Sequence, residues 1–80
     1  MTDEQLLSVC TRILRGLLLD DSIVLTMATR REEVPKFDSL MYINFIVALE
    51  IELGIKFKVA DVESFANVGE IVARIKTMLK

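Results

Sequence analysis

The sequence contains no histidine and no tryptophan, and only one cysteine, one proline and three glycines occur among its 80 residues. Without histidine a Ser-His-Asp catalytic triad is excluded, and one cysteine gives little support for a zinc site, so we expect no bound metal. A single cysteine, Cys10, also excludes an intramolecular disulfide and favours a reducing compartment, for which the cytoplasm is our expectation. The scarcity of glycine and proline argues against a disordered or low-complexity chain.

Basic clusters and long apolar runs are also missing. The net charge is −2 at pH 7, whereas nucleic-acid binding requires a clustered basic surface, so we expect no nucleic-acid partner. No apolar run approaches about 18 residues, so no membrane span is expected, and the N-terminal segment lacks the pattern of a signal peptide. The length predicts one small domain, residues 1–80. Its 52% hydrophobic residues exceed what so small an interior can bury.

Residues 2 to 18 have the pattern of an amphipathic helix. Thr2 and Gln5 are spaced as a capping box. Behind them apolar residues recur at steps of three and four, with polar residues between them. The apolar set is Leu6, Leu7, Cys10, Ile13, Leu14, Leu17 and Leu18. Nothing near Cys10 in the sequence would lower its thiol pKa, so we predict a core residue and not a reactive thiol.

The stretch from residue 20 to 37 shows no convincing helical period and predicts a long loop. Ile23, Val24 and Leu25 form a short apolar run. We favour a loop pinned to the core over a strand, because no second strand is evident to pair with it. A loop of this length in a compact domain is usually functional, and here it leads to Asp38 and Ser39.

Two further helices are predicted. One runs from Ser39 to about Leu53, with Asp38 as its N-cap and Gly54 as its terminator. Its predicted core stripe is Leu40, Ile43, Ile46, Leu49 and Leu53. The other follows Asn67 as its cap. Its predicted apolar face is Val68, Ile71, Val72, Ile75 and Leu79.

Residues 61–65, between these two helices, are expected to form a single helical turn. The predicted fold class is therefore all-α: a small bundle of three main helices plus one short helical turn. A long loop separates the first and second helices.

The triplet Asp38-Ser39-Leu40 places one hydroxyl at the exposed start of the second helix. A helix start leaves backbone N–H groups unpaired and carries partial positive charge, so it favours an anion such as a phosphate on Ser39. Asp38, as the cap, fixes the corner from which that hydroxyl projects. By itself the triplet is a weak motif, because serine is common at helix starts.

In its context the triplet resembles the motif of acyl carrier proteins. Its serine is followed by Leu40, Ile43, Ala48-Leu49-Glu50 and Leu53 in the order of that family's second helix. The segments Gly54-Ile55-Lys56-Phe57 and Asn67-Val68-Gly69-Glu70-Ile71 resemble the route into the family's third and fourth helices. The resemblance covers nearly the full chain and agrees with the predicted fold class.

The resemblance implies that Ser39 carries a 4′-phosphopantetheine arm, with Asp38 as part of the attachment motif. Such a protein is not an enzyme; it holds an acyl group as a thioester and presents it to enzymes of a lipid, polyketide or other specialised pathway. The implied partners are a phosphopantetheinyl transferase, which uses coenzyme A and Mg²⁺, and acyl-loading and acyl-transferring enzymes. A monomer is the family expectation.

The second helix departs from the family pattern. Carriers of fatty acid synthesis usually present an acidic second helix to basic partners, and Leu-Gly-x, which often precedes their D-S-L, is missing here. The residues that we predict for docking are Leu40, next to Ser39, and the outward positions Met41, Asn44, Val47, Glu50 and Ile51, of which one is acidic. We therefore predict weak electrostatic steering, apolar docking and a dedicated pathway instead of bulk fatty acid synthesis.

The acyl group is expected to lie partly between the helices. The candidate lining residues are Tyr42, Ile46, Leu49, Phe57 and Phe65. Each is equally compatible with an ordinary place in the core. Tyr42 lies close to Ser39 in the sequence, so its bulk is expected to restrict access.

Three alternatives stay open. A peptidyl or aminoacyl carrier has the same fold and arm. The glycine-rich segment that typically precedes the serine of those domains is missing here. An unmodified helical adaptor would use the apolar surface to bind proteins. An enzyme would need an acid and a base, and the pairs Asp20-Asp21 and Glu32-Glu33 are the candidates. Adjacent carboxylates in an exposed loop are more often solvated, so catalysis is the least favoured reading.

Overall fold

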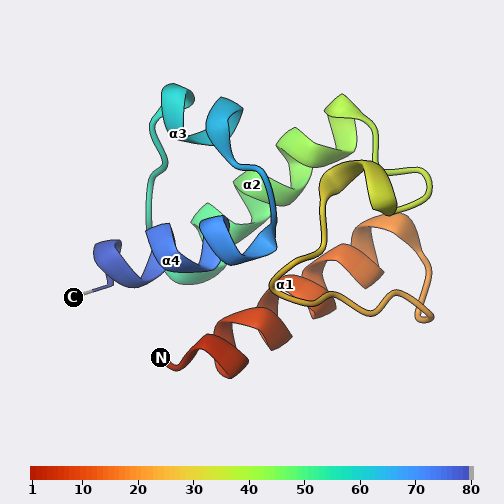
Figure 1. The fold of residues 1–80 in the computed structure, drawn as a ribbon, viewed down its shortest axis with the longest axis horizontal. Coiled ribbons are helices and arrows are strands. Elements are labelled where there is room, and N and C mark those ends of the chain that lie inside the picture. Colours follow the sequence, from red (N-terminus) through yellow and green to blue (C-terminus); the bar gives the residue numbers. More distant parts are fainter. Residues whose placement is uncertain (80) are drawn as a thin grey trace.

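The computed structural model describes residues 1–79, which form a bundle of four α-helices (Figure 1). Helix α1 spans Asp3–Leu18, α2 spans Ser39–Leu53, α3 spans Val59–Ser64 and α4 spans Val68–Met78. The described part of the chain contains no strand. The predicted all-α class, with a long first loop and one short helix, is confirmed.

Helix α1 begins at the predicted capping box. The Thr2 hydroxyl accepts a hydrogen bond from the Gln5 N–H at 3.1 Å, and Gln5 Oε1 accepts one from the Thr2 N–H at 2.8 Å. The helix buries Leu6, Cys10 and Leu14 against the other helices. Cys10 is fully buried, and this burial raises the pKa of its thiol to about 12, which confirms a core residue.

Helix α2 has the predicted limits, but only part of its predicted core stripe is buried, including Ile46 and Leu49. Its buried residues are Tyr42, Phe45, Ile46 and Leu49. Leu40 is 68% exposed and Ile43 is 49% exposed, so their assignment to the core was wrong. Apolar residues occur on all sides of this helix, so its sequence has no unique apolar face. Contacts with the rest of the chain decide which side is buried.

Helices α3 and α4 complete the bundle. The predicted turn at residues 61–65 is a six-residue helix that begins at Val59. Helix α4 is capped by Asn67, whose side-chain oxygen accepts a hydrogen bond from the Glu70 N–H at 2.9 Å. Its buried face is Val68, Ile71, Val72 and Ile75, as predicted. Leu79, predicted on the same face, is exposed.

The long loop is pinned to the core, as predicted. Ile23 and Leu25 are buried and Val24 between them is 73% exposed. The loop also reaches the start of α4, where the Gly69 N–H donates to the Met27 carbonyl oxygen at 2.8 Å. A Cβ atom on Gly69 would lie 2.8 Å from that same oxygen, so only glycine permits this approach.

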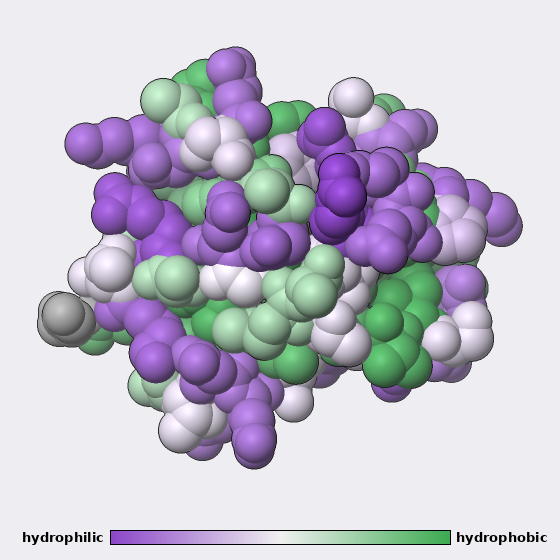
Figure 2. All heavy atoms as spheres, in the orientation of Figure 1, coloured by the Kyte–Doolittle hydropathy of each residue, from purple (hydrophilic) through white to green (hydrophobic). Residues whose placement is uncertain are grey.

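Helix α2 packs against α1, and α4 also packs against α1. Figure 2 shows hydrophobic side chains across the middle of one face, between hydrophilic groups above and below. Some apolar side chains therefore do remain outside. Within the described residues, no helix is long and apolar enough to cross a membrane.

Candidate functional site at the start of helix α2

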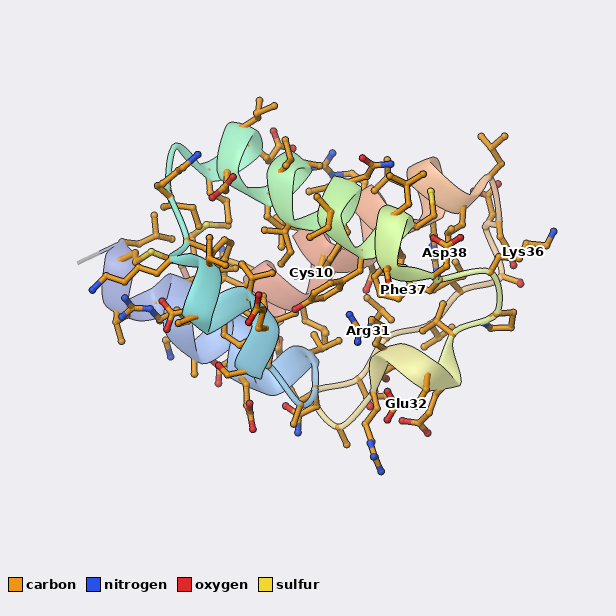
Figure 3. All side chains as sticks on the ribbon, turned by 90° about the horizontal axis from the view of Figure 1, so that it is seen from above. Cys10, Arg31, Glu32, Lys36, Phe37 and Asp38 are labelled. Carbon is orange, nitrogen blue, oxygen red and sulfur yellow. The ribbon has the colours of Figure 1, made fainter. Side chains whose placement is uncertain are left out.

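The chain reaches α2 through a tight turn over residues 34–37. The Phe37 N–H donates to the Val34 carbonyl oxygen at 3.3 Å, and Lys36 adopts a left-handed φ of +66°. Proline before a left-handed third residue is the pattern of a type II turn, which usually places glycine there. Lys36 therefore occupies the position of glycine in the missing Leu-Gly-x segment. Its side chain points away from the bundle (Figure 3).

Phe37 anchors this turn to the body of the helix. Its ring packs edge-to-face on Tyr42, with centroids 5.9 Å apart, and on Phe45, with centroids 5.7 Å apart. The residue before an N-cap often packs on the fourth residue of the helix, an arrangement called a hydrophobic staple. Phe37 and Tyr42 occupy those two positions. The staple fixes the direction in which the chain enters α2.

Asp38 and Ser39 lie between the two ends of this staple. Asp38 Oδ1 accepts a hydrogen bond from the Met41 N–H at 2.9 Å, so Asp38 is the predicted N-cap. Ser39 is the first residue of α2 and is exposed. The hydroxyls of two other serines, Ser22 and Ser64, donate hydrogen bonds to neighbouring oxygens.

Tyr42 lies one helical turn beyond Ser39 and points inward. It is only 6% exposed, and its hydroxyl donates a hydrogen bond to the Val62 carbonyl oxygen of α3 at 2.7 Å. The Arg31 guanidinium lies over its ring, 4.5 Å from the centroid. Burial raises the pKa of the Tyr42 hydroxyl, while the positive charge of Arg31 opposes that rise. The hydroxyl therefore stays protonated near neutral pH and remains a donor.

Arg31 comes from a 3₁₀ turn, Arg31–Glu33, that was not predicted from the sequence. The turn is held by local bonds, including one from the Arg30 N–H to Glu33 Oε1 at 2.7 Å. Figure 3 shows the Arg31 side chain pointing toward α2 and Glu32 pointing away from it. Three residues are too few to show a helical period, so the turn gives no sequence signal.

The residues present fit a phosphodiester on Ser39. The serine is exposed at the start of a 15-residue helix, and the N–H groups and partial positive charge of a helix start favour an anion. The Arg31 guanidinium lies one turn further on, over Tyr42. Within residues 1–79, no cluster of three or more His, Cys, Asp or Glu side chains could hold a metal ion.

The predicted docking residues differ in their accessibility. Leu40, Val47 and Ile51 are 68%, 44% and 78% exposed, and Asn44 is also exposed. Met41 is half-buried. Ile43, which was predicted as core, is 49% exposed and completes a line along α2. We call Leu40, Ile43, Val47 and Ile51 the apolar stripe.

The two acidic residues of α2 are bound within the chain. Glu50 is half-buried, and its Oε2 accepts a hydrogen bond from the Phe57 N–H at 2.8 Å. One of its two carboxylate oxygens is therefore engaged within the chain, whereas the sequence had suggested a fully outward side chain. Glu52 forms an ion pair with Arg12 of α1.

Two of the five candidate acyl-lining residues border a cavity. Tyr42 and Phe65 line a cavity of about 20 Å³ beneath the long loop. Ile46, Leu49 and Phe57 do not line it and are buried in the core. The rings of Phe57 and Phe65 pack edge-to-face with centroids 5.7 Å apart. The structure therefore does not join the five candidates around one space.

A family model described as the phosphopantetheine attachment site matches residues 36–75, which is half of the chain. The chain belongs to the acyl carrier protein family. Its structure is also similar to the solution NMR structure of a holo acyl carrier protein from Geobacter metallireducens, with a TM-score of 0.83 and 37% sequence identity. That match covers 91% of this chain and 84% of the other.

A comparison with curated protein sequences finds no match. As a member of its family, this acyl carrier protein carries 4′-phosphopantetheine covalently and interacts with the enzymes that attach the arm and handle its acyl group. It is a carrier and not an enzyme.

Proposed function

We propose that Ser39 is the attachment site of the 4′-phosphopantetheine arm. The observation that carries this proposal is the position of Ser39: it is exposed, it begins α2, and it lies within the matched residues 36–75. When bound, the arm supplies a thiol that holds an acyl group as a thioester. The protein's own part is to fix the direction of α2 through the Asp38 cap and the staple of Phe37 on Tyr42.

The test is the intact mass after incubation with coenzyme A, Mg²⁺ and a broad-specificity phosphopantetheinyl transferase. We expect the natural sequence to gain one phosphopantetheine and Ser39→Ala to gain none. The Ser64→Ala variant is the matched control, because Ser64 is the other exposed serine that borders a helix end. Modification of Ser39→Ala would refute the assignment.

We further propose that this carrier docks on its partners through the apolar stripe of α2 and serves a dedicated pathway. The stripe begins directly after Ser39, and its residues are between 44% and 78% exposed. The carboxylates of Glu50 and Glu52 are held by contacts within the chain. Helix α2 therefore carries only these two acidic residues to steer a basic partner, one of them already paired with Arg12, and burial of the stripe supplies the affinity.

The phosphopantetheinyl transferase is the partner with which docking is tested. Leu40→Glu is expected to lower its kcat/KM by about tenfold or more, because burying one leucine is worth roughly 1.5–3 kcal/mol. Glutamate in the first turn suits the helix dipole, so α2 stays folded. The matched control is Val24→Glu, since Val24 is 73% exposed but lies in the loop. If added salt lowered the kcat/KM of the natural sequence more than the Leu40→Glu substitution does, electrostatic docking would be favoured instead.

A further inference from the structure

We infer that Tyr42 closes the route from Ser39 into the core, so that the acyl group on this carrier is short and stays at the surface. The inference rests on Ser39 as the attachment site. It concerns the class of cargo, which neither the family nor the attachment site determines.

Tyr42 occupies the position that a chain starting at Ser39 has to pass. Residues three apart on a helix are neighbours on its surface, and Tyr42 is the inward-facing neighbour of Ser39. Its hydroxyl reaches across to α3, where it donates to the Val62 carbonyl oxygen at 2.7 Å. This bond joins α2 and α3 close to the attachment site.

The ring of Tyr42 is held on two further sides. The edge-to-face contact with Phe37 fixes it from the approach to α2. The guanidinium of Arg31 covers it at 4.5 Å from the centroid. Moving the ring aside would break both contacts and would leave the Val62 carbonyl oxygen and the tyrosine hydroxyl without their hydrogen bond.

No alkyl chain fits into the cavity beside Tyr42. The cavity that Tyr42 borders measures about 20 Å³, and a water molecule alone needs roughly 10–15 Å³ on this measure. Phe45 and Leu49, the next inward residues of α2, are 1% and 0% exposed. A close-packed protein interior admits a chain only by displacing side chains.

The carrier therefore gives a long alkyl chain no shelter from water. The cost of leaving a chain exposed grows with its apolar area. An acetyl-sized group exposes little apolar area and loses little by staying outside. A closed core thus selects short acyl groups, which remain directly accessible to a docked enzyme.

The experiment compares acetyl and octanoyl groups on the same protein. Each is attached to the natural sequence, Tyr42→Ala and Val72→Ala by the transferase from the corresponding acyl-coenzyme A. Intact mass verifies loading, and a failure to load counts against Ser39 and not against Tyr42. The readouts are the Tm of each loaded protein and the amide NMR shifts of Phe45 and Leu49.

We expect the natural sequence to show the same Tm and the same core shifts with either group. In Tyr42→Ala, octanoyl is expected to raise the Tm above that of the acetyl form, because a group bound in the core stabilises the folded state. Val72 is fully buried on α4, so Val72→Ala also makes a cavity but leaves Tyr42 in place. It is expected to show no such difference.

Two results would overturn the inference. One is a higher Tm and shifted Phe45 and Leu49 amides in the octanoyl form of the natural sequence. The other is an octanoyl gain in Val72→Ala as large as in Tyr42→Ala, since any cavity would then suffice. The decisive comparison uses the natural sequence, so it stands even where a variant fails to fold.

Discussion

Replacing Lys36 by glycine is expected to stabilise the protein without changing its surface contacts. Lys36 has a φ of +66° and an exposed side chain. A left-handed conformation costs a residue with a Cβ about 1–2 kcal/mol, whereas glycine loses about 0.5–1 kcal/mol more backbone entropy on folding. The difference predicts that Lys36→Gly raises the free energy of unfolding by about 0.5–1 kcal/mol.

The charge of Lys36 changes this figure little. Hydrogen bonds from Ser22 are the main cause of the lowered pKa of Asp20, and the attraction of Lys36 ranks below them. Asp20 is exposed, and exposed charges at a protein surface interact weakly. In a domain of this size, about 0.5–1 kcal/mol corresponds to a rise in Tm of roughly 2–8 °C.

The assay is urea unfolding followed by circular dichroism, with thermal scans alongside. Lys36→Ala is the control, because it removes the charge but keeps the Cβ, and it is expected to give no gain. Gly54 has nearly the same φ, +65°, with open space around it. Gly54→Ala should therefore lose about as much stability as Lys36→Gly gains. If Lys36→Ala stabilised as much as Lys36→Gly, charge and not backbone strain would be the cause, and the reasoning would fail.

Two further predictions concern Gly69 and Cys10. Gly69→Ala is expected to destabilise the protein by about 1–3 kcal/mol, because its Cβ would press on the Met27 carbonyl oxygen 2.8 Å away. Gly16→Ala, in open space on α1, should instead be neutral or stabilising in the same urea titration. The Cys10 thiol, with its pKa raised to about 12, should not react with Ellman's reagent in the native apo protein at pH 8 and should react fully in denaturant. The native holo protein should then titrate as one thiol, that of the arm, and a second native thiol would contradict the assigned burial.

Features of the fold that depend on local sequence were predicted correctly. The capping box at Thr2, the Asp38 and Asn67 caps and the Gly54 terminator involve residues within a few positions of one another. Such contacts form from local chain geometry, so the limits of α1, α2 and α4 follow from the sequence.

The orientation of α2 could not be predicted in the same way. Its apolar residues occur on every side, so a stripe through Leu40 and Ile43 and one through Tyr42 and Phe45 fit the pattern equally well. The contacts of α2 with α1 and with Phe37 decide between them. One signal was available: Phe37 and Tyr42 have the spacing of a hydrophobic staple, which would have placed Tyr42 inward.

The site was predicted in part. The sequence located Ser39 and its cap, because both belong to one local motif. It did not show that Arg31 lies over Tyr42, or that the Val62 carbonyl oxygen accepts from Tyr42, because these contacts join residues 11 and 20 positions apart. The engagement of Glu50 by the Phe57 N–H was likewise not visible in the pattern.

The central claim is that the arm is attached at Ser39, and fragmentation mass spectrometry of the modified natural sequence tests it most directly. The chain has four serines, and Ser8 and Ser22 are two of the alternatives. We predict that all fragments containing residue 39 carry the phosphopantetheine and that fragments containing only Ser8, Ser22 or Ser64 do not. Phosphopantetheine on any of those three serines, with residue 39 unmodified, would contradict the account.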